Sequence, residues 1–455
     1  QGLRFDWEPP ILIDLPNCAA VDTGLQVRDA LIEVNDVEVT ALKRGEIEPM
    51  FRARPLKLVF RRKCEEPTET GDDDLQDPKA FIEFLISANI RLVRLEFLLE
   101  LHEDGRSLPR RQEAEAMRTR NGDTALVEIH EYKKLHVNDV TGRVSIPIAE
   151  RTSALTSVNF CAVSHMWEAM QHPDPWGFQL AQIAEKYRER VGNGLTWVFL
   201  DYVSLFQFRR TPEEDGWFYK ALDGMHILYS HEAVEVTLLT DLTPEHLKSA
   251  REVWAFSEAE SLVVLMSIAM LKLNATPHHL RGWCQAEKQW ALLRGLLLAG
   301  CVPLCPDVFR QLMQEMVFTH RNDAPMVYKL QEKVFQMKTS TTTQLQLEKL
   351  DRVALDNLRE ALPHYTKLTD IAVSGTPLTN EDAVALLQSG ARDVQMENCE
   401  LNDATVIAEA LLHKSTSALK QLNLRRNRIA DLGPLEDVMQ QRPGLIIEMT
   451  GQKLG

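Results

Sequence analysis

The stretch VNFCAVSHMW, residues 158–167, decides the fold at the centre of this chain. Its first seven residues are almost all apolar, which is typical of a strand buried on both faces of a parallel sheet. Two further apolar runs, residues 196–203 and 233–239, are expected to be strands of the same sheet. Helical spacing of apolar residues predicts helices over residues 175–191, 212–231 and 279–299. This alternation of strands and helices predicts an α/β domain with a central parallel sheet.

Polar side chains stand where two of these strands end. Ser164 and His165 follow the first strand, and Asp201 lies near the end of the second. Ligands of such sheets bind beyond the carboxyl ends of the strands, so these three residues are site candidates. A long insertion, residues 244–277, is expected to be helical and separates the third strand from the last helix. Its apolar residues 260–273 are too few to cross a bilayer and are expected to lie in a core.

Three phrases, taken together, resemble the heterokaryon-incompatibility (HET) family, which is itself similar to Toll/interleukin-1 receptor (TIR) domains. They are a Ser-His-x-Trp phrase after the first strand, a phrase with Asp and Gln in register after the second, and Arg-Gly-Trp-x-x-x-Glu. The residues that carry the resemblance are Ser164, His165, Trp167, Asp201, Gln207, Arg281, Gly282, Trp283 and Glu287. The likeness covers residues 158–300, and Ser204 departs from it by replacing the family's usual Cys.

The resemblance implies a catalytic role for Glu287, because NAD-cleaving TIR domains use a helix-borne Glu in the same phrase. Breaking the bond between nicotinamide and ribose builds positive charge on the ribose, and a nearby carboxylate stabilises that state. NAD or NADP would then be the substrate, and no cofactor is implied. The substrate-binding residues implied are Ser164 and Asp201 for ribose hydroxyls, Trp167 or Trp283 for stacking, Arg281 for a phosphate, and His165 beside them.

A structural reading of the same residues stays open. Trp283 also suits a core, Glu287 also suits a pair with Arg281, and His165 also suits a structural hydrogen bond. The sequence therefore supports two hypotheses: an intracellular signalling or scaffold protein, or an NAD(P) glycohydrolase. A Glu287 that lies in an open cleft within reach of Ser164 and Asp201 favours the enzyme, and one that is buried against Arg281 or covered by the insertion favours the scaffold.

The first residues resemble a PDZ domain. Gly2, Leu3, Arg4 and Phe5 match the loop that precedes the peptide-binding strand in that family, so the resemblance assigns them to peptide binding. A small β domain is implied over residues 1–63.

The last part of the chain repeats itself. Phrases that begin at Leu368, Ala391, Leu419 and Gly444 approximate L-x-x-L-x-L-x-x-N/C-x-L, and each of the first three is followed by a helical phrase. This pattern resembles leucine-rich repeats, in which a residue such as Cys399 or Asn427 satisfies backbone groups at the turns.

Composition sets the remaining expectations. The 455 residues carry a net charge of -15 and seven Cys, which favours a reducing, cytoplasmic setting and disfavours nucleic acid. We expect no metal and no membrane span, protein partners on the PDZ-like and repeat surfaces, and possible self-association. The expected divisions are 1–63 PDZ-like, 64–77 acidic linker, 78–150 helical connector, 151–338 HET/TIR-like, 339–362 linker and helix, and 363–455 leucine-rich repeats.

Overall fold

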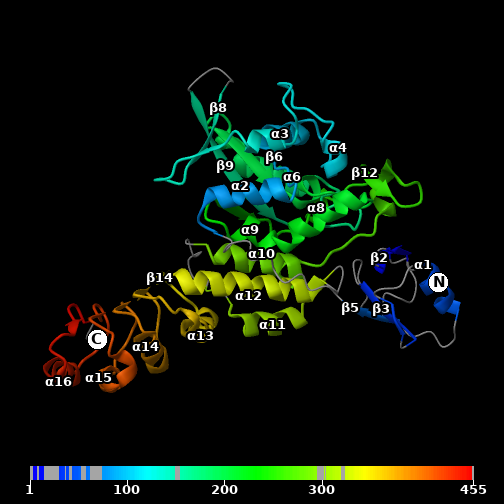
Figure 1. Cartoon of the computed structure of the whole chain (residues 1–455). Helices are drawn as coiled ribbons and strands as arrows, with labels where there is room; N and C mark the ends of the chain where they lie inside the picture. The colour runs from blue at the N-terminus through cyan, green and yellow to red at the C-terminus, as the bar shows by residue number, and fades with distance from the viewer. Residues whose placement is uncertain are drawn as a thin grey trace. The chain divides into compact units, whose positions relative to one another are not determined.

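The computed structural model describes residues 4–7, 10–14, 30–35, 37–39, 44–52, 58–61, 74–148, 154–294, 302, 304–318 and 323–452. The chain divides into two compact units, Gln1–Asp73 and Asp74–Gly455. None of the described helices combines the length and the apolar character that crossing a bilayer requires. The whole is a mixed α/β protein (Figure 1).

The described residues of the first unit form a five-stranded antiparallel sheet, a short α-helix and a 3-10 helix. Its strands run in the order β1-β2-β3-β4, and β5 pairs with β3. The elements are β1 Arg4–Trp7, β2 Pro10–Asp14, β3 Ala30–Val34, β4 Val37–Glu38, α1 Arg44–Ile47, η2 Glu48–Arg52 and β5 Leu58–Arg61. Its described core contains Leu31, Val34, Val39 and Ile47.

The second unit begins with a six-stranded sheet whose centre is parallel. β9 lies between β10 on one side and β11 on the other, and all three run parallel. β6 pairs antiparallel with β10. β8 pairs antiparallel with the first residues of β9, and β7 pairs antiparallel with β8. The strands are β6 Val93–Arg94, β7 His136–Val137, β8 Val144–Pro147, β9 Leu155–Ser164, β10 Leu195–Phe199 and β11 Val234–Leu238. The expected parallel strands are thus confirmed, and strands from residues 78–150 complete the sheet.

Helices pack on both faces of this sheet. One core joins it to α3 and α6, and the other joins it to α2, α9, α10 and α12. Alternate residues of β9 enter different cores. Phe160 and Ala162 lie in the core with α2, α9, α10 and α12, and Cys161 and Val163 lie in the core with α3 and α6. The helices are α2 Pro78–Ser87, α3 Leu95–Glu103, α4 Arg111–Ala114, α5 Ile129–Tyr132, α6 Phe178–Tyr187, α7 Asp201–Ser204, α8 Pro212–Asp223, α9 Met225–Ser230, α10 Gly282–Leu292, α11 Pro306–Gln314 and α12 Ala324–Thr341.

Two expected elements differ in the structure. The helix expected over residues 212–231 divides at Gly224 into α8 and α9, and the ring of Phe84 lies so close to Gly224 that a Cβ there would stand 2.2 Å from it. The strand expected to continue to residue 203 ends at Phe199, and α7 follows because the carbonyl of Leu200 accepts bonds from the backbone N–H groups of Val203 and Ser204.

The insertion at residues 244–277 is a β-hairpin, so the expectation of a helical insertion was wrong. β12 Glu252–Ser257 and β13 Leu262–Ser267 pair antiparallel, with Val253 opposite Met266. β-branched and aromatic residues favour this pleated pairing over a helix. The expectation of a buried core holds only for part of residues 260–273: Ile268 and Leu271 lie in a small core, whereas Leu262 and Leu265 are 63% and 48% exposed.

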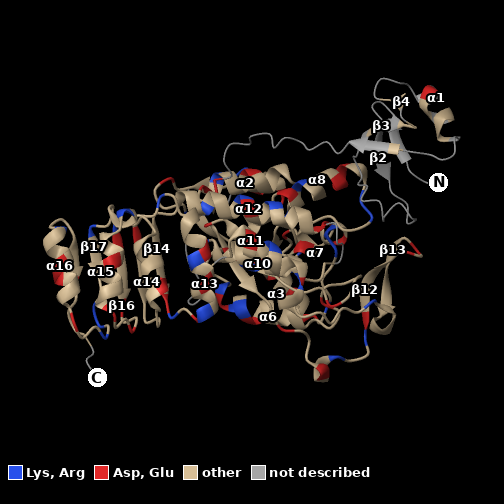
Figure 2. Ribbon diagram, turned by 90° about the horizontal axis from the view of Figure 1, so that it is seen from below, with Lys and Arg blue, Asp and Glu red and all other residues tan. Residues whose placement is uncertain are grey.

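The second unit ends in a parallel sheet in strict chain order, β14-β15-β16-β17-β18. A helix follows each of the first four strands, and Figures 1 and 2 show α13, α14, α15 and α16 in sequence along this part. The elements are β14 Gln344–Glu348, α13 Arg352–Ala361, β15 Asp370–Ser374, α14 Asn380–Leu387, β16 Asp393–Glu397, α15 Ala404–Leu412, β17 Gln421–Asn423, α16 Gly433–Gln441 and β18 Ile446–Glu448. The four sequence repeats correspond to β15, β16, β17 and β18. β14 is the first strand of the sheet, and its sequence was not recognised as a repeat.

Asn427 confirms the expectation that a polar residue satisfies backbone groups at the turns. Its side-chain oxygen accepts bonds from the backbone N–H groups of Cys399 (2.9 Å) and Leu401 (3.2 Å). Its amide nitrogen donates to the carbonyls of Met396 (2.7 Å) and Leu424 (2.9 Å). Asn427 therefore ties two neighbouring turns together from a fully buried position.

Candidate active site at the carboxyl edge of the central sheet

Alternation along β9 sends Ser164 and His165 toward opposite faces of the sheet. Ser164 is the last residue of the strand and bonds to Glu287 of α10 on one face. His165 follows it and turns to α6, where its Nδ1 lies 2.7 Å from Oε1 of Gln179. A single strand end therefore delivers polar groups to helices on both faces.

His165 and Asp201 form a buried pair across the two parallel strands. The Nε2 atom of His165 lies 2.8 Å from Oδ1 of Asp201, and the indole of Trp167 donates to Oδ2 at 2.9 Å. Burial alone lowers the pKa of His165, but the Asp201 charge and hydrogen bond outweigh it, so the pKa lies above its ordinary value. Burial likewise opposes ionisation of Asp201, yet His165 and Trp167 hold the pKa of that carboxyl below its ordinary value.

Glu287 lies in the same region on the second turn of α10. Burial raises the pKa of its carboxyl to about 8, and the charge of Asp201 adds to the rise. Hydrogen bonds from Ser164 and Tyr229 and the charge of His165 act in the opposite direction. At neutral pH this carboxyl is mostly protonated. A carboxyl with this balance of burial and polar partners is a common feature of catalytic sites.

Two residues that sequence reasoning missed complete the network. The hydroxyl of Tyr229, from α9, donates to the carbonyl of Val163 at 3.4 Å and lies close enough to Glu287 to lower the pKa of its carboxyl. His278, from the 3-10 helix η6 His278–Leu280 at the end of the insertion, places its Nε2 atom 3.2 Å from Oγ of Ser164. Tyr229 lies in the stretch MHILYSHEAVEV, residues 225–236, which resembles a further phrase of the HET family with a one-residue slip and so offered a signal for it. No phrase in the sequence marked His278.

Arg281 and Trp283 are directed elsewhere. Arg281 donates to the carbonyls of Thr276 (2.7 Å), Trp167 (2.7 Å) and Asn274 (3.1 Å), which ties the end of the insertion to the loop after β9. Trp283 donates from its indole to Oδ2 of Asp323 at 3.0 Å. The expected phosphate and stacking roles therefore have no support in these contacts. Neither residue pairs with Glu287 in the hydrogen bonds and ion pairs of the described chain.

The helix that carries Glu287 is fixed by a close approach at its start. Gly282 is the first residue of α10, and a Cβ there would stand 2.0 Å from the ring of Phe318. The Gly of the Arg-Gly-Trp phrase thus has a packing reason.

Most of the network lies below the surface. Ser164, His165 and Glu287 are 0%, 6% and 9% exposed. Asp201 reaches solvent to a greater extent, with 31% of its side chain exposed.

The residues assigned to peptide binding contribute little to this description. Gly2 and Leu3 lie outside the described residues. Arg4 and Phe5 belong to strand β1, which pairs with β2, rather than to a loop.

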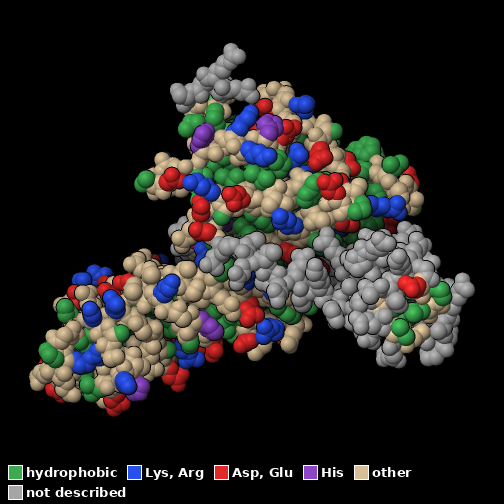
Figure 3. Space-filling view, viewed as in Figure 1, with side chains coloured by type: hydrophobic (Ala, Val, Ile, Leu, Met, Phe, Trp, Pro, Cys, Tyr) green, Lys and Arg blue, Asp and Glu red, His purple; other side chains and the backbone are tan. Residues whose placement is uncertain are grey.

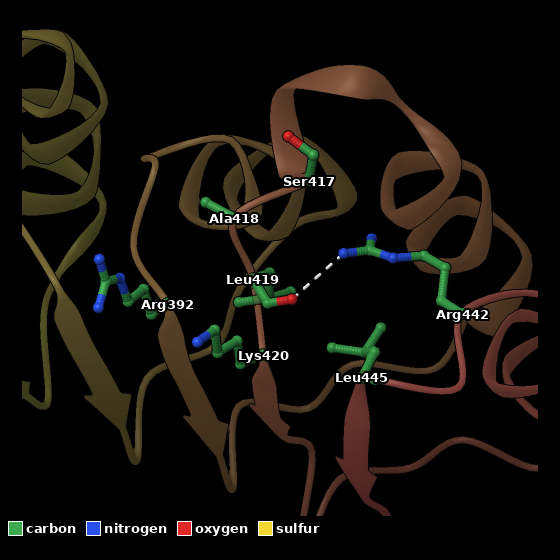
Figure 4. A pocket seen from close by; sticks show the side chains of 8 residues that line it. Arg392, Ser417, Ala418, Leu419, Lys420, Arg442 and Leu445 are labelled. Atoms are coloured by element: carbon green, nitrogen blue, oxygen red, sulfur yellow. Dashed lines mark hydrogen bonds between the residues drawn. The ribbon is translucent and has the colours of Figure 1, made fainter.

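A separate depression of about 540 Å³ lies at the amino ends of the last strands of the repeat sheet (Figure 4). Arg442 stands at its edge and donates to the carbonyls of Leu411, Thr416 and Leu419, so its charge holds the backbone there. Arg392 and Lys420 line the same depression from exposed positions. Without a buried polar group aimed into it, this depression is a weaker candidate than the edge of the central sheet.

Comparison of the chain with family models, with curated proteins and with solved structures gives no match. The site is therefore judged on its own geometry.

Proposed function

We propose that the central α/β part hydrolyses the bond between nicotinamide and ribose in NAD or NADP, with Glu287 as the catalytic carboxylate. One observation carries the proposal: Glu287 is buried beside Ser164, Tyr229 and the His165–Asp201 pair, with its pKa raised to about 8. The Ser-His-x-Trp and Arg-Gly-Trp-x-x-x-Glu phrases add the resemblance to HET and TIR domains.

The chemistry follows from charge. As the bond to nicotinamide breaks, positive charge grows on the ribose, and an ionised Glu287 stabilises it in surroundings that hold little water. Nicotinamide leaves as a neutral molecule, so the reaction needs no strong general acid. Asp201 is the more exposed carboxylate and suits ribose hydroxyls, with Trp167 beside it as a stacking surface. Activity should therefore rise with pH toward about 8, as Glu287 ionises.

The flanking parts are proposed as protein-binding modules of a signalling or scaffold protein. The parallel strands β14 to β18 with a helix after each of the first four support a leucine-rich-repeat reading, and the antiparallel sheet β1 to β5 supports a PDZ-like one. Cationic and anionic side chains are interspersed on the face shown in Figure 3, which suits protein partners better than phosphate backbones. The free buried thiols support a cytoplasmic setting; they are Cys161, Cys284, Cys305 and Cys399.

A scaffold without catalytic activity is the second candidate. The low exposure of Ser164, His165 and Glu287 favours it, because a closed network needs no substrate to be stable. In that case protonated Glu287 serves as a hydrogen-bonding core residue.

Nicotinamide release separates the two candidates. The full chain is incubated with NAD and with NADP over a range of protein concentrations, which tests whether assembly of the chain activates the site. Glu287→Gln should lower the rate by about 100-fold or more, the usual loss when a charge-stabilising group is removed. Glu409→Gln, at an exposed position on α15, is the matched control and should leave the rate unchanged. A folded wild type that releases no nicotinamide at any concentration would leave the scaffold candidate.

A further inference from the structure

Both ring nitrogens of His165 have a hydrogen-bond partner, and both partners offer an oxygen. The Nδ1 atom lies 2.7 Å from Oε1 of Gln179, and the Nε2 atom lies 2.8 Å from Oδ1 of Asp201. A neutral imidazole donates from one nitrogen only, whereas an imidazolium donates from both. The protonation of the ring therefore depends on whether Gln179 and Asp201 are acceptors at these two contacts.

The surroundings of Gln179 fix the orientation of its amide. Its Nε2 atom donates to the carbonyl of Met166 at 2.7 Å, and two further acceptors lie near it: Oε1 of Glu168 at 3.3 Å and the carbonyl of Pro173 at 3.4 Å. If the amide were turned round, its oxygen would face these acceptors without a proton between them. Gln179 is 1% exposed, so water does not relieve such a clash. The amide oxygen therefore faces His165, and Nδ1 must donate to it.

Asp201 is likewise held as an acceptor. Its Oδ1 atom also accepts from the backbone N–H group of Tyr202 at 2.6 Å, and its Oδ2 atom accepts from the indole of Trp167 at 2.9 Å. Hydrogen bonds from such donors favour the ionised carboxylate. The Nε2 atom of His165 therefore donates as well, and the ring carries two protons.

We infer that Gln179 is a positioning residue that keeps His165 doubly protonated, so that His165 serves the site as a fixed positive charge and not as a base. The inference rests on the proposed function for its effect on catalysis. The His165 cation balances the neighbouring Asp201 anion, so the charge that develops on Glu287 is not opposed by a second uncompensated carboxylate. A neutral His165 would leave Asp201 unbalanced, and repulsion from Asp201 would make Glu287 harder to ionise.

The other groups around His165 favour the same state. Burial lowers the pKa of His172 and of His278 to about 4, so both rings are neutral at pH 7 and place no positive charge against His165. Burial raises the pKa of Asp174 to about 6, so this carboxyl is mostly ionised at pH 7 and attracts the His165 cation. The charged and titratable groups that face His165 are Asp201, Glu287, Cys284, Asp174, His172 and His278.

The test follows the ring nitrogens of His165 by NMR in the full chain with isotope-labelled histidine. The chemical shift of each nitrogen shows whether it carries a proton, and the His165 signals are identified by their absence in His165→Asn. In wild type, both nitrogens should be protonated at pH 7. In Gln179→Leu, which removes the acceptor, the pH at which the ring loses its second proton should fall by about 1 to 2 units, the usual worth of a hydrogen bond to a charged group.

Two further variants separate this role from packing. Gln179→Glu keeps an oxygen beside Nδ1 and should not lower the pH at which the second proton is lost. Gln182→Leu, the same substitution elsewhere on α6, is the matched control and should titrate as wild type does. A purely structural Gln179 would lower stability when replaced but would leave the ring protonation of His165 unchanged.

Nicotinamide release gives the second readout. In Gln179→Leu, the rise of the rate with pH should move upward by about 1 unit, because Glu287 ionises beside an unbalanced Asp201. If wild type releases no nicotinamide yet Gln179→Leu shifts the ring titration, the glycohydrolase proposal fails and the positioning role stands. The inference is overturned if the ring titrates alike in Gln179→Leu and wild type. Should Gln179→Leu not fold, wild type decides, since a single ring proton at pH 7 also overturns the inference.

Discussion

The central sheet and the repeat sheet of the second unit use polar residues at the ends of their parallel strands in different ways. In the repeat sheet, buried Asn427 bonds only to backbone groups of the neighbouring turns. At the edge of the central sheet, His165, Asp201 and Glu287 bond to other side chains, and their pKa values move from the ordinary range. Hydrogen bonds to backbone groups stabilise the conformation of a turn. Hydrogen bonds between ionisable side chains also change the pH at which those side chains gain or lose protons. The difference supports the proposal that chemistry takes place at the edge of the central sheet.

The largest expected effect is a loss of stability when Asn427 of the repeat sheet is replaced. Asn427→Ala leaves two N–H groups and two carbonyls without their buried partner, which should cost about 3 kcal/mol or more in the free energy of unfolding. Chemical denaturation measures the loss, and Asn402→Ala at an exposed position is the control. Nicotinamide release per folded molecule should not change. A small loss of stability would mean that water replaces the amide and that the turn does not depend on it.

The next effect concerns the pH dependence of stability. The folded pKa of Glu287, about 8, lies above its unfolded value, so the folded state binds the extra proton. Stability contributed by this group is present at low pH and is lost as pH rises through about 8.

Between pH 5 and pH 8, wild type should therefore lose about 3 kcal/mol relative to Glu287→Gln, whose neutral amide has no proton to lose. Unfolding curves for both proteins across that range measure the difference. If the free energies of unfolding of the two proteins changed with pH in the same way, the pKa of Glu287 would lie near its ordinary value. The polar residues of the central sheet edge would then be structural, as Asn427 is in the repeat sheet.

The smallest expected effect concerns the pair of Asp201 and His165 at the edge of the central sheet. Asp201→Asn removes the anion that faces His165, so burial should bring the pKa of His165 below its ordinary value. Histidine ring signals in NMR titrations measure this shift directly. We expect a stability loss of about 1 to 2 kcal/mol, moderated by the partial exposure of Asp201.

The sign of this loss depends on pH. His165 contributes stability that is complete below its unfolded pKa and is lost as pH rises through its raised folded pKa. Asp201 contributes stability above its unfolded pKa. The loss should thus be largest between about pH 4 and pH 6.5, and a loss that grows toward alkaline pH would contradict the ion pair.

The sequence by itself determined the three parallel strands of the central sheet, four strands of the repeat sheet and several members of the site. Apolar runs fixed β9, β10 and β11, and a repeated phrase fixed β15 to β18, because burial imposes a period that local sequence records. The positions at the ends of the predicted strands indicated Ser164, His165 and Asp201 as site candidates. The Arg-Gly-Trp-x-x-x-Glu phrase indicated Glu287.

Only the tertiary structure decided what these residues touch. The insertion formed a hairpin, and His278 at its end reached Ser164 from 114 residues away along the chain. Arg281 turned to backbone carbonyls and Trp283 to Asp323, since neighbouring segments offered those partners. The burial that raises the pKa of Glu287 likewise comes from α9, α10 and β9 packing together. Such contacts depend on chain segments far apart in sequence, and no local period encodes them.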